Sequence, residues 1–317
     1  MDLKAQIKKV KPHLAESSIK NYIISLQKLH ERIFGNKNIE NLKFLEDEKK
    51  IMETLKDFKD TTKRNYLNSV IIFLQAHDDK SIDTDTFKEY SKIRDKLNNE
   101  LKTKSTSGEK SEKQKENWIT GEEYEDIMNT YKKFFSKNKI FSKDLDKDDL
   151  RLLQEYALLK LYQQIPSRND FATIRIMTPR EYQKIKGNEL VENLLITDRD
   201  KYYFIINSWK TKKNDMDRRR IDVPVDIKKV LKLLIGKQKG KYLFTNKNGT
   251  PLKRNGLTKH LQTIFKKFYP DKNVSTSMLR HIYLTSKYGD VKEEMKKDAE
   301  LLAHSGSIQQ QYIKEKD

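Results

Sequence analysis

The sequence predicts a mostly α-helical protein with a small antiparallel β-sheet, arranged in two domains. Three observations predict this. Apolar residues recur at a three-to-four spacing over most of the chain, whereas a period of two occurs only between Asn193 and Pro224. A polar stretch without large apolar residues, 102–117, separates two regions that could each bury a core. The length of 317 residues also suits two domains, at roughly 100–200 residues per domain.

The first region, 1–101, is expected to be an all-helical domain. Its first clear helix covers Ser17–Phe34, where apolar residues fall on one face and Ser17 or Ser18 can cap the start. Further helices are expected at Ile51–Phe58, Thr61–Ala76 and Thr84–Leu101.

The stretch 102–117 reads KTKSTSGEKSEKQKEN and is expected to be a flexible linker. Gly108 and the neighbouring Ser and Thr residues favour coil. An exposed helix end is the alternative.

The second region, 118–317, is expected to combine helices with the small sheet. Thr120 is the expected N-cap of its first helix, with acidic residues following in the first turn. Strands are expected at Leu194–Ile196, Tyr202–Ile206 and Arg220–Val223. Helices are expected at Glu122–Phe135, Lys147–Gln164, Val225–Leu234, Leu257–Phe268 and Ser277–Lys287, with further helix from Lys292 to the end.

Composition narrows the classes of function. A formal charge of +19 and a pI near 9.6 favour a polyanionic partner, most often nucleic acid, although drift toward lysine codons would give the same excess. The absence of cysteine excludes disulfides and thiolate metal sites, and no glycine-rich nucleotide loop occurs. The charged start, Met1–Val10, and the lack of an apolar run near the roughly 20 residues that span a bilayer predict a soluble intracellular protein with no membrane partner.

The second region carries residues suited to cutting a phosphodiester without metal or cofactor. That reaction needs cations for the phosphate oxygens, an acid for the leaving oxygen and a nucleophile in line. The candidates, in chain order, are Arg168 in IPSRNDFATIRI, Lys210 in NSWKTKKNDMDRRRIDVP, Arg280 in STSMLRHIYLT, and both His304 and Tyr312 in LLAHSGSIQQQYIK.

With these residues in this order, 118–317 resembles the tyrosine recombinase (phage integrase) family. The catalytic domain of that family carries Arg, Lys, H-x-x-R, His or Trp, and Tyr in the same succession. More weakly, the helices of 1–101 resemble the core-binding domain that closes a clamp around DNA. The resemblance therefore implies a two-domain clamp, with an α+β catalytic domain after a helical core-binding domain.

The resemblance also implies a role for each candidate. Arg168 and Arg280 would bind the phosphate, and Lys210 would protonate the leaving oxygen, with Lys212 and Lys213 as rivals. His304 would hydrogen-bond a phosphate oxygen, and Tyr312 would be the nucleophile. Asp170 would be a supporting acid.

The sequence departs from the family at one point. Ser277 occupies the histidine position of H-x-x-R, and His281, four residues later, does not simply replace it. Serine can hydrogen-bond phosphate but cannot carry charge or exchange protons near neutral pH. This departure puts activity in doubt.

The function implied is that of a site-specific recombinase or integrase of a mobile element or virus. It would form a 3′-phosphotyrosyl bond on double-stranded DNA, as a homotetramer, without ATP or any other cofactor. The alternatives are a type IB topoisomerase and a catalytically weak DNA-binding relative. The basic residues expected to contact DNA are Lys63, Arg64, Lys212, Lys213, Arg218 and Arg219, together with Arg220 and the linker lysines.

Overall fold

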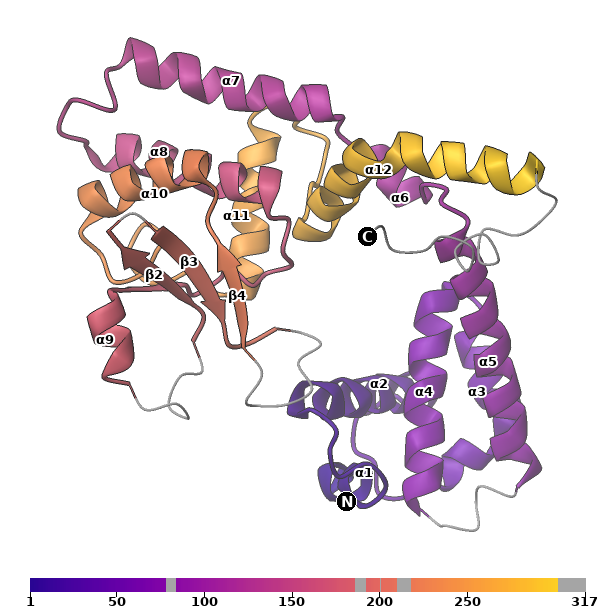
Figure 1. Ribbon diagram of the computed structural model, residues 1–317. Helices are drawn as coiled ribbons and strands as arrows, with labels where there is room; N and C mark the ends of the chain where they lie inside the picture. The colour runs from indigo at the N-terminus through magenta and orange to yellow at the C-terminus, as the bar shows by residue number, and fades with distance from the viewer. Residues whose placement is uncertain (78–83, 186–191, 200, 210–217, 302–317) are drawn as a thin grey trace, which may run out of the picture. The chain divides into compact units, whose positions relative to one another are not determined.

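The computed structural model of the protein describes residues 1–77, 84–185, 192–199, 201–209 and 218–301 (Figure 1). The chain divides into two compact units, Met1–Lys110 and Ser111–Asp317. Each unit has a hydrophobic core of its own.

Unit 1 is helical and is organised around one central helix. Asp60–His77 (α4) packs against α1, α2 and α5, and its buried residues include Leu67, Val70 and Phe73. Apolar residues occupy most of its faces because it has neighbours on several sides. The other elements of the unit are α1 (Leu3–Val10), α2 (Glu16–Phe34), a 3₁₀ turn (Lys43–Glu46), α3 (Glu48–Leu55) and α5 (Asp85–Thr106).

Unit 2 surrounds a small sheet with helices. The sheet has the order β1-β2-β3-β4, from Arg175–Met177, Leu194–Asp198, Lys201–Ile206 and Arg219–Asp222. The helices are α6 (Glu112–Asn117), α7 (Gly121–Lys137), α8 (Lys147–Gln164), α9 (Pro179–Gln183), α10 (Val225–Gln238), α11 (Arg254–Lys266) and α12 (Thr276–Leu301).

The two faces of the sheet meet different partners. Leu195, Phe204 and Ile206 join the main core with residues of α8, while Leu194 and Ile196 pack with residues near α9 on the opposite face (Figure 1). Successive side chains of a strand point to opposite faces, so this division follows directly from the register of β2 and β3.

The predicted fold class, mostly α with a small sheet, is confirmed. The three expected strands correspond to β2, β3 and β4, which pair antiparallel. The prediction of a purely antiparallel sheet was wrong, because Arg175–Met177 adds β1 parallel to β2. A strand of three residues is too short to show a periodic pattern.

The stretch 102–117, which was predicted to be a flexible linker, is helical at both of its ends. On one side α5 continues to Thr106, and on the other α6 spans Glu112–Asn117. Ser111 and Gln114 form a capping box, which pairs backbone donors at the start of α6. The division between the two units, after Lys110, falls between these helices.

The last described helix is longer than expected. α12 runs without a break from Thr276 to Leu301, passing through Gly289 and the residues between the two helical segments that the sequence suggests. No helix in the described ranges is long and apolar enough to cross a bilayer.

The predicted N-cap at Thr120 is confirmed and leads to a stability prediction. The Thr120 hydroxyl accepts from the backbone N–H of Glu123 at 3.0 Å, and the Glu123 carboxylate accepts from the N–H of Thr120 at 2.7 Å. Loss of an N-cap costs about 1 kcal/mol. We expect Thr120→Ala to lower the melting temperature of unit 2 by about 2–4 °C in calorimetry of the full chain.

Thr130→Ala is the matched control for this substitution. Thr130 lies in the middle of the same helix, where its hydroxyl only bonds back to the carbonyl of Asp126. Alanine is the better helix former there, so no loss of stability is expected. Equal melting temperatures for Thr120→Ala and the unsubstituted protein would show that the cap contributes nothing.

Candidate active site

The turn that follows α8 positions Arg168. The hydroxyl of Tyr162, in the last turn of α8, donates to the carbonyl of Arg168 at 2.5 Å. Burial raises the pKa of Tyr162, so its phenol remains a protonated donor. The backbone of Arg168 is therefore fixed to a buried helix, while its side chain is exposed.

Arg280 lies against the same turn. It belongs to α12, is half-buried, and donates from Nε to the carbonyl of Pro166 at 3.2 Å. Burial lowers the pKa of Arg280, and the positive charge of Arg168 is the second cause. Two arginines that are distant in the sequence thus lie close enough to repel each other, an arrangement that an anion between them would stabilise.

Asp170 is the acid beside these arginines. It is buried, and burial raises the pKa of its carboxyl. Nearby positive charge acts in the opposite direction and comes from Arg254, Arg219, Arg280 and Arg168, in decreasing order of effect. We call these four residues the arginine cluster.

Two members of the cluster extend what the sequence predicted. Arg219 was expected only as a DNA-binding residue, whereas it acts electrostatically on Asp170. Arg254 was not singled out, because the helix was expected to begin at Leu257 and Arg254 then falls in a loop. No local motif marks it in the sequence.

Asn193 ties the turn to the sheet. Its amide group donates to the carbonyls of Asp170 at 2.8 Å and of Ser208 at 3.2 Å. Its side-chain oxygen accepts from the backbone N–H groups of Asn207 at 2.9 Å and Ser208 at 2.8 Å. The side chain is buried, and it fixes the end of β3 to the turn that carries Arg168.

Two arginines of the cluster also contact the residues that immediately precede the segment containing Lys210. Arg254 donates to the carbonyl of Ser208 at 3.1 Å and to its hydroxyl at 3.2 Å. The guanidinium of Arg219 lies 5.8 Å from the centre of the Trp209 ring. Lys210, Lys212 and Lys213 themselves lie outside the described residues.

The position that departs from the family motif lies in the first turn of α12. Ser277 is exposed there, as is His281 one turn later. The helix start is held by Ser275, whose hydroxyl accepts from the N–H of Met278 at 3.3 Å.

The structure thus gathers Arg168, Asp170 and Arg280 from the predicted set. His304 and Tyr312 lie outside the described residues. Among the other basic residues predicted to bind DNA, Lys63 and Arg64 are half-buried on α4, and Arg218 donates to the hydroxyl of Tyr182 at 3.2 Å. Within the described ranges no three carboxylate or imidazole groups form a metal site.

No protein-family model matches the chain, and no curated protein matches it. Among solved structures, the chain is similar to the XerH site-specific recombinase in its pre-cleavage complex with the difH substrate. The sequence identity is 18% and the TM-score is 0.46, over 99% of this chain and 81% of that chain.

Asn193 provides a test of how the cluster is held together. We expect Asn193→Ala to lower the free energy of unfolding by about 2–3 kcal/mol, because two buried backbone N–H groups lose their acceptor. Urea unfolding of the full chain measures this loss. Asn248→Ala, in an exposed turn, is the control and should change stability little. Similar small effects of both substitutions would contradict the bridging role of Asn193.

Proposed function

We propose that this protein cleaves and rejoins duplex DNA through a covalent tyrosine intermediate, as a site-specific recombinase of the tyrosine family. The observation that carries the proposal is the convergence of Arg168 and Arg280 at one turn, beside a buried carboxylate. Phosphoryl transfer depends largely on positioned positive charge around the phosphate. The order of the remaining motif residues, Lys210, His304 and Tyr312, supplies the other groups that the reaction needs.

The reaction would proceed in two reversible transesterifications. The phenolate oxygen of Tyr312, which has already lost its proton to solvent, attacks the phosphorus and forms a 3′-phosphotyrosyl ester as the bond to the 5′-oxygen breaks. Lys210 gives a proton to that oxygen, and Arg168 and Arg280 bind the non-bridging oxygens, aided by His304. A 5′-hydroxyl from a second strand then attacks the ester and releases Tyr312. The ester conserves the bond energy, so no ATP is consumed.

Tyr312 requires activation for this step. A phenol with a pKa near 10 is mostly protonated at neutral pH. Positive charge of the kind gathered around Asp170 favours the phenolate, and it also stabilises charge that develops on the phosphate. The arginine cluster would therefore serve both partners of the first step.

The partners that we propose are duplex DNA and three further copies of this chain. Basic residues outside the cluster, such as Lys63, Arg64 and Arg218, would contact the DNA backbone and carry little sequence information. Exchange of strands between two duplexes needs four cleavages, which a homotetramer can supply.

Ser277 favours a second candidate, a DNA-binding protein that cleaves weakly or not at all. The exposed Ser277 stands where the family has a proton-exchanging histidine, and His281 does not share that position. The two candidates differ in one observable, the covalent bond between protein and DNA.

Trapping of that bond is the decisive experiment. Fragments of the DNA that flanks the gene, with nicks at random positions, would be incubated with the full chain and then denatured. We expect an adduct that survives denaturant and is absent for Tyr312→Phe. Arg168→Ala and Arg280→Ala should each reduce it by about 100-fold or more, since removal of one charge-stabilising donor has effects of this size.

Tyr288→Phe and Arg180→Ala are the controls, because both residues are exposed on the surface of unit 2. Neither should change the yield of adduct. DNA binding without an adduct would favour the second candidate, and an adduct that persists in Tyr312→Phe would exclude Tyr312 as the nucleophile.

A further prediction concerns Arg254 as a positioning residue. Its two hydrogen bonds hold Ser208, shortly before Lys210 in the chain. Arg254→Ala should slow adduct formation by about tenfold, because a misplaced acid protonates the leaving oxygen poorly. Replacing the bridging 5′-oxygen by sulfur gives a leaving group that needs no acid, and this substrate should restore the rate of Arg254→Ala but not of Arg168→Ala. A rate that stays low on the sulfur substrate would contradict the positioning role.

A further inference from the structure

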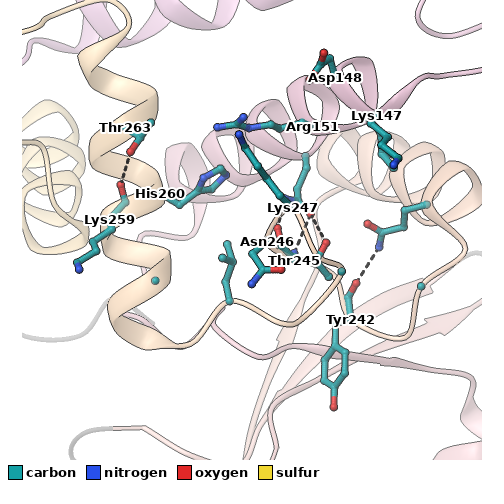
Figure 2. A pocket seen from close by; sticks show the side chains of 17 residues that line it. Lys147, Asp148, Arg151, Tyr242, Thr245, Asn246, Lys247, Lys259, His260 and Thr263 are labelled. Carbon is teal, nitrogen blue, oxygen red and sulfur yellow. Dashed lines mark hydrogen bonds between the residues drawn. The ribbon is translucent and has the colours of Figure 1, made fainter.

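Unit 2 contains a second cationic site, in a pocket away from the arginine cluster. The pocket has a volume of about 620 Å³ and lies between the beginning of α8, one face of α11 and the loop that precedes α11 (Figure 2). Arg151 lines it from the first turns of α8, whereas Arg168 follows the end of that helix. Because an α-helix rises 1.5 Å per residue, Arg151 lies about 20 Å from the end of α8.

Two cationic side chains and an imidazole, from three different elements, meet in this pocket. Figure 2 shows Arg151 of α8, Lys247 of the loop and His260 of α11 pointing toward one space. Lys147 and Lys259 also line the pocket, and its one acidic lining residue, Asp148, points away from that space in the same view.

The neutral polar groups of the lining are already engaged with one another. Gln154 bonds both the N–H and the carbonyl of Thr245, at 2.9 and 2.8 Å. Gln238 donates to the carbonyl of Tyr242 at 3.0 Å, and the Asn246 side chain accepts from two backbone N–H groups of its own turn. The groups left to meet a ligand are therefore mainly cationic, which selects for an anion.

One buried polar atom in the lining lacks a partner. Nε2 of His260 is inaccessible to solvent and has no hydrogen-bond partner within the described part of the chain. Burial lowers the pKa of His260, although the charge of Glu155 opposes this effect. An unpaired buried nitrogen of this kind destabilises the fold.

The nearest buried acid does not cancel the charge of the pocket. Glu155 is fully buried and pairs with Lys267, accepts from the Tyr131 hydroxyl at 2.7 Å and lies 3.5 Å from Nε of Arg151. Two cations thus share one carboxylate. Lys247, which is exposed, adds charge that no acid in the described residues balances.

The volume indicates the size of the ligand. A water molecule occupies about 30 Å³, and sites for larger organic ligands measure about 300–1,000 Å³. Leu150 and Leu252 supply apolar surface beside the cations. From the convergence of Arg151, Lys247 and His260 we infer that this pocket binds a small phosphate ester of nucleotide size, independently of any reaction at the arginine cluster.

Calorimetric titration of the full chain without DNA tests this inference. The probes are ATP, AMP, adenosine and inorganic phosphate at 0.15 M salt. We expect ATP or AMP to bind more tightly than either adenosine or inorganic phosphate, because only the nucleotides fill both the cationic and the apolar parts. Lys247→Ala should weaken that binding by about tenfold or more, the effect of losing one charge-assisted hydrogen bond.

The control is Lys266→Ala, the same change in charge at an exposed residue of α11 that does not line the pocket. Arg151→Gln should also weaken binding, and because Lys247 lies in an exposed turn, its variant remains informative if Arg151→Gln fails to fold. No nucleotide binding at millimolar concentration, or equal weakening by Lys266→Ala, would overturn the inference. One further result would overturn it: a short DNA duplex displaces the nucleotide, and Lys247→Ala weakens the binding of the duplex as much as the binding of the nucleotide. The pocket would then be a site for the DNA backbone.

Discussion

One buried carboxylate, that of Asp170, governs how the candidate active site is built. Burial of a charge is unfavourable unless positive charge or hydrogen bonds compensate it, and here four guanidinium groups offset part of that cost. The four arginines lie on different elements: the turn after α8, β4, the start of α11, and α12. Because four positive charges surround a single acid, the cluster keeps a net positive charge. The single negative charge of a phosphate diester would neutralise part of that net charge.

The sequence could predict those parts of the fold that depend on local patterns. The helices α2 to α5, α7 and α8, the N-cap at Thr120 and strands β2 to β4 follow from periodicity and capping chemistry. The closeness of Arg168 and Arg280 is what the family resemblance implies. Other features depend on contacts that no local window contains. β1 is defined by its pairing with β2, and Arg254 becomes informative only when the fold brings it to Ser208. The unbroken course of α12 through Gly289 likewise runs against the helix preference of glycine.

The distribution of cations distinguishes functional charge from charge that reflects composition. Many lysines pair with exposed acids close by, as Lys4 and Lys8 do with Glu16 and Lys115 does with Glu112. Surface pairs of this kind contribute little to stability and report no ligand. The arginines around Asp170 differ, because hydrogen bonds to Pro166 and Ser208 fix two of them in place. The net charge of +19 therefore says less about function than the position of these few arginines.

The serine at position 277 affects one part of the proposed chemistry and leaves another intact. The positive charge that would neutralise a phosphate comes from the arginine cluster, and an exposed side chain on α12 adds little to it. An imidazole at this position could accept and return a proton, and a serine hydroxyl cannot do so near neutral pH. Phosphate binding and proton transfer would therefore be separable in the reaction that we propose. In that reaction, the departure at Ser277 would affect proton transfer other than the step assigned to Lys210, and would hardly change the affinity for the DNA backbone.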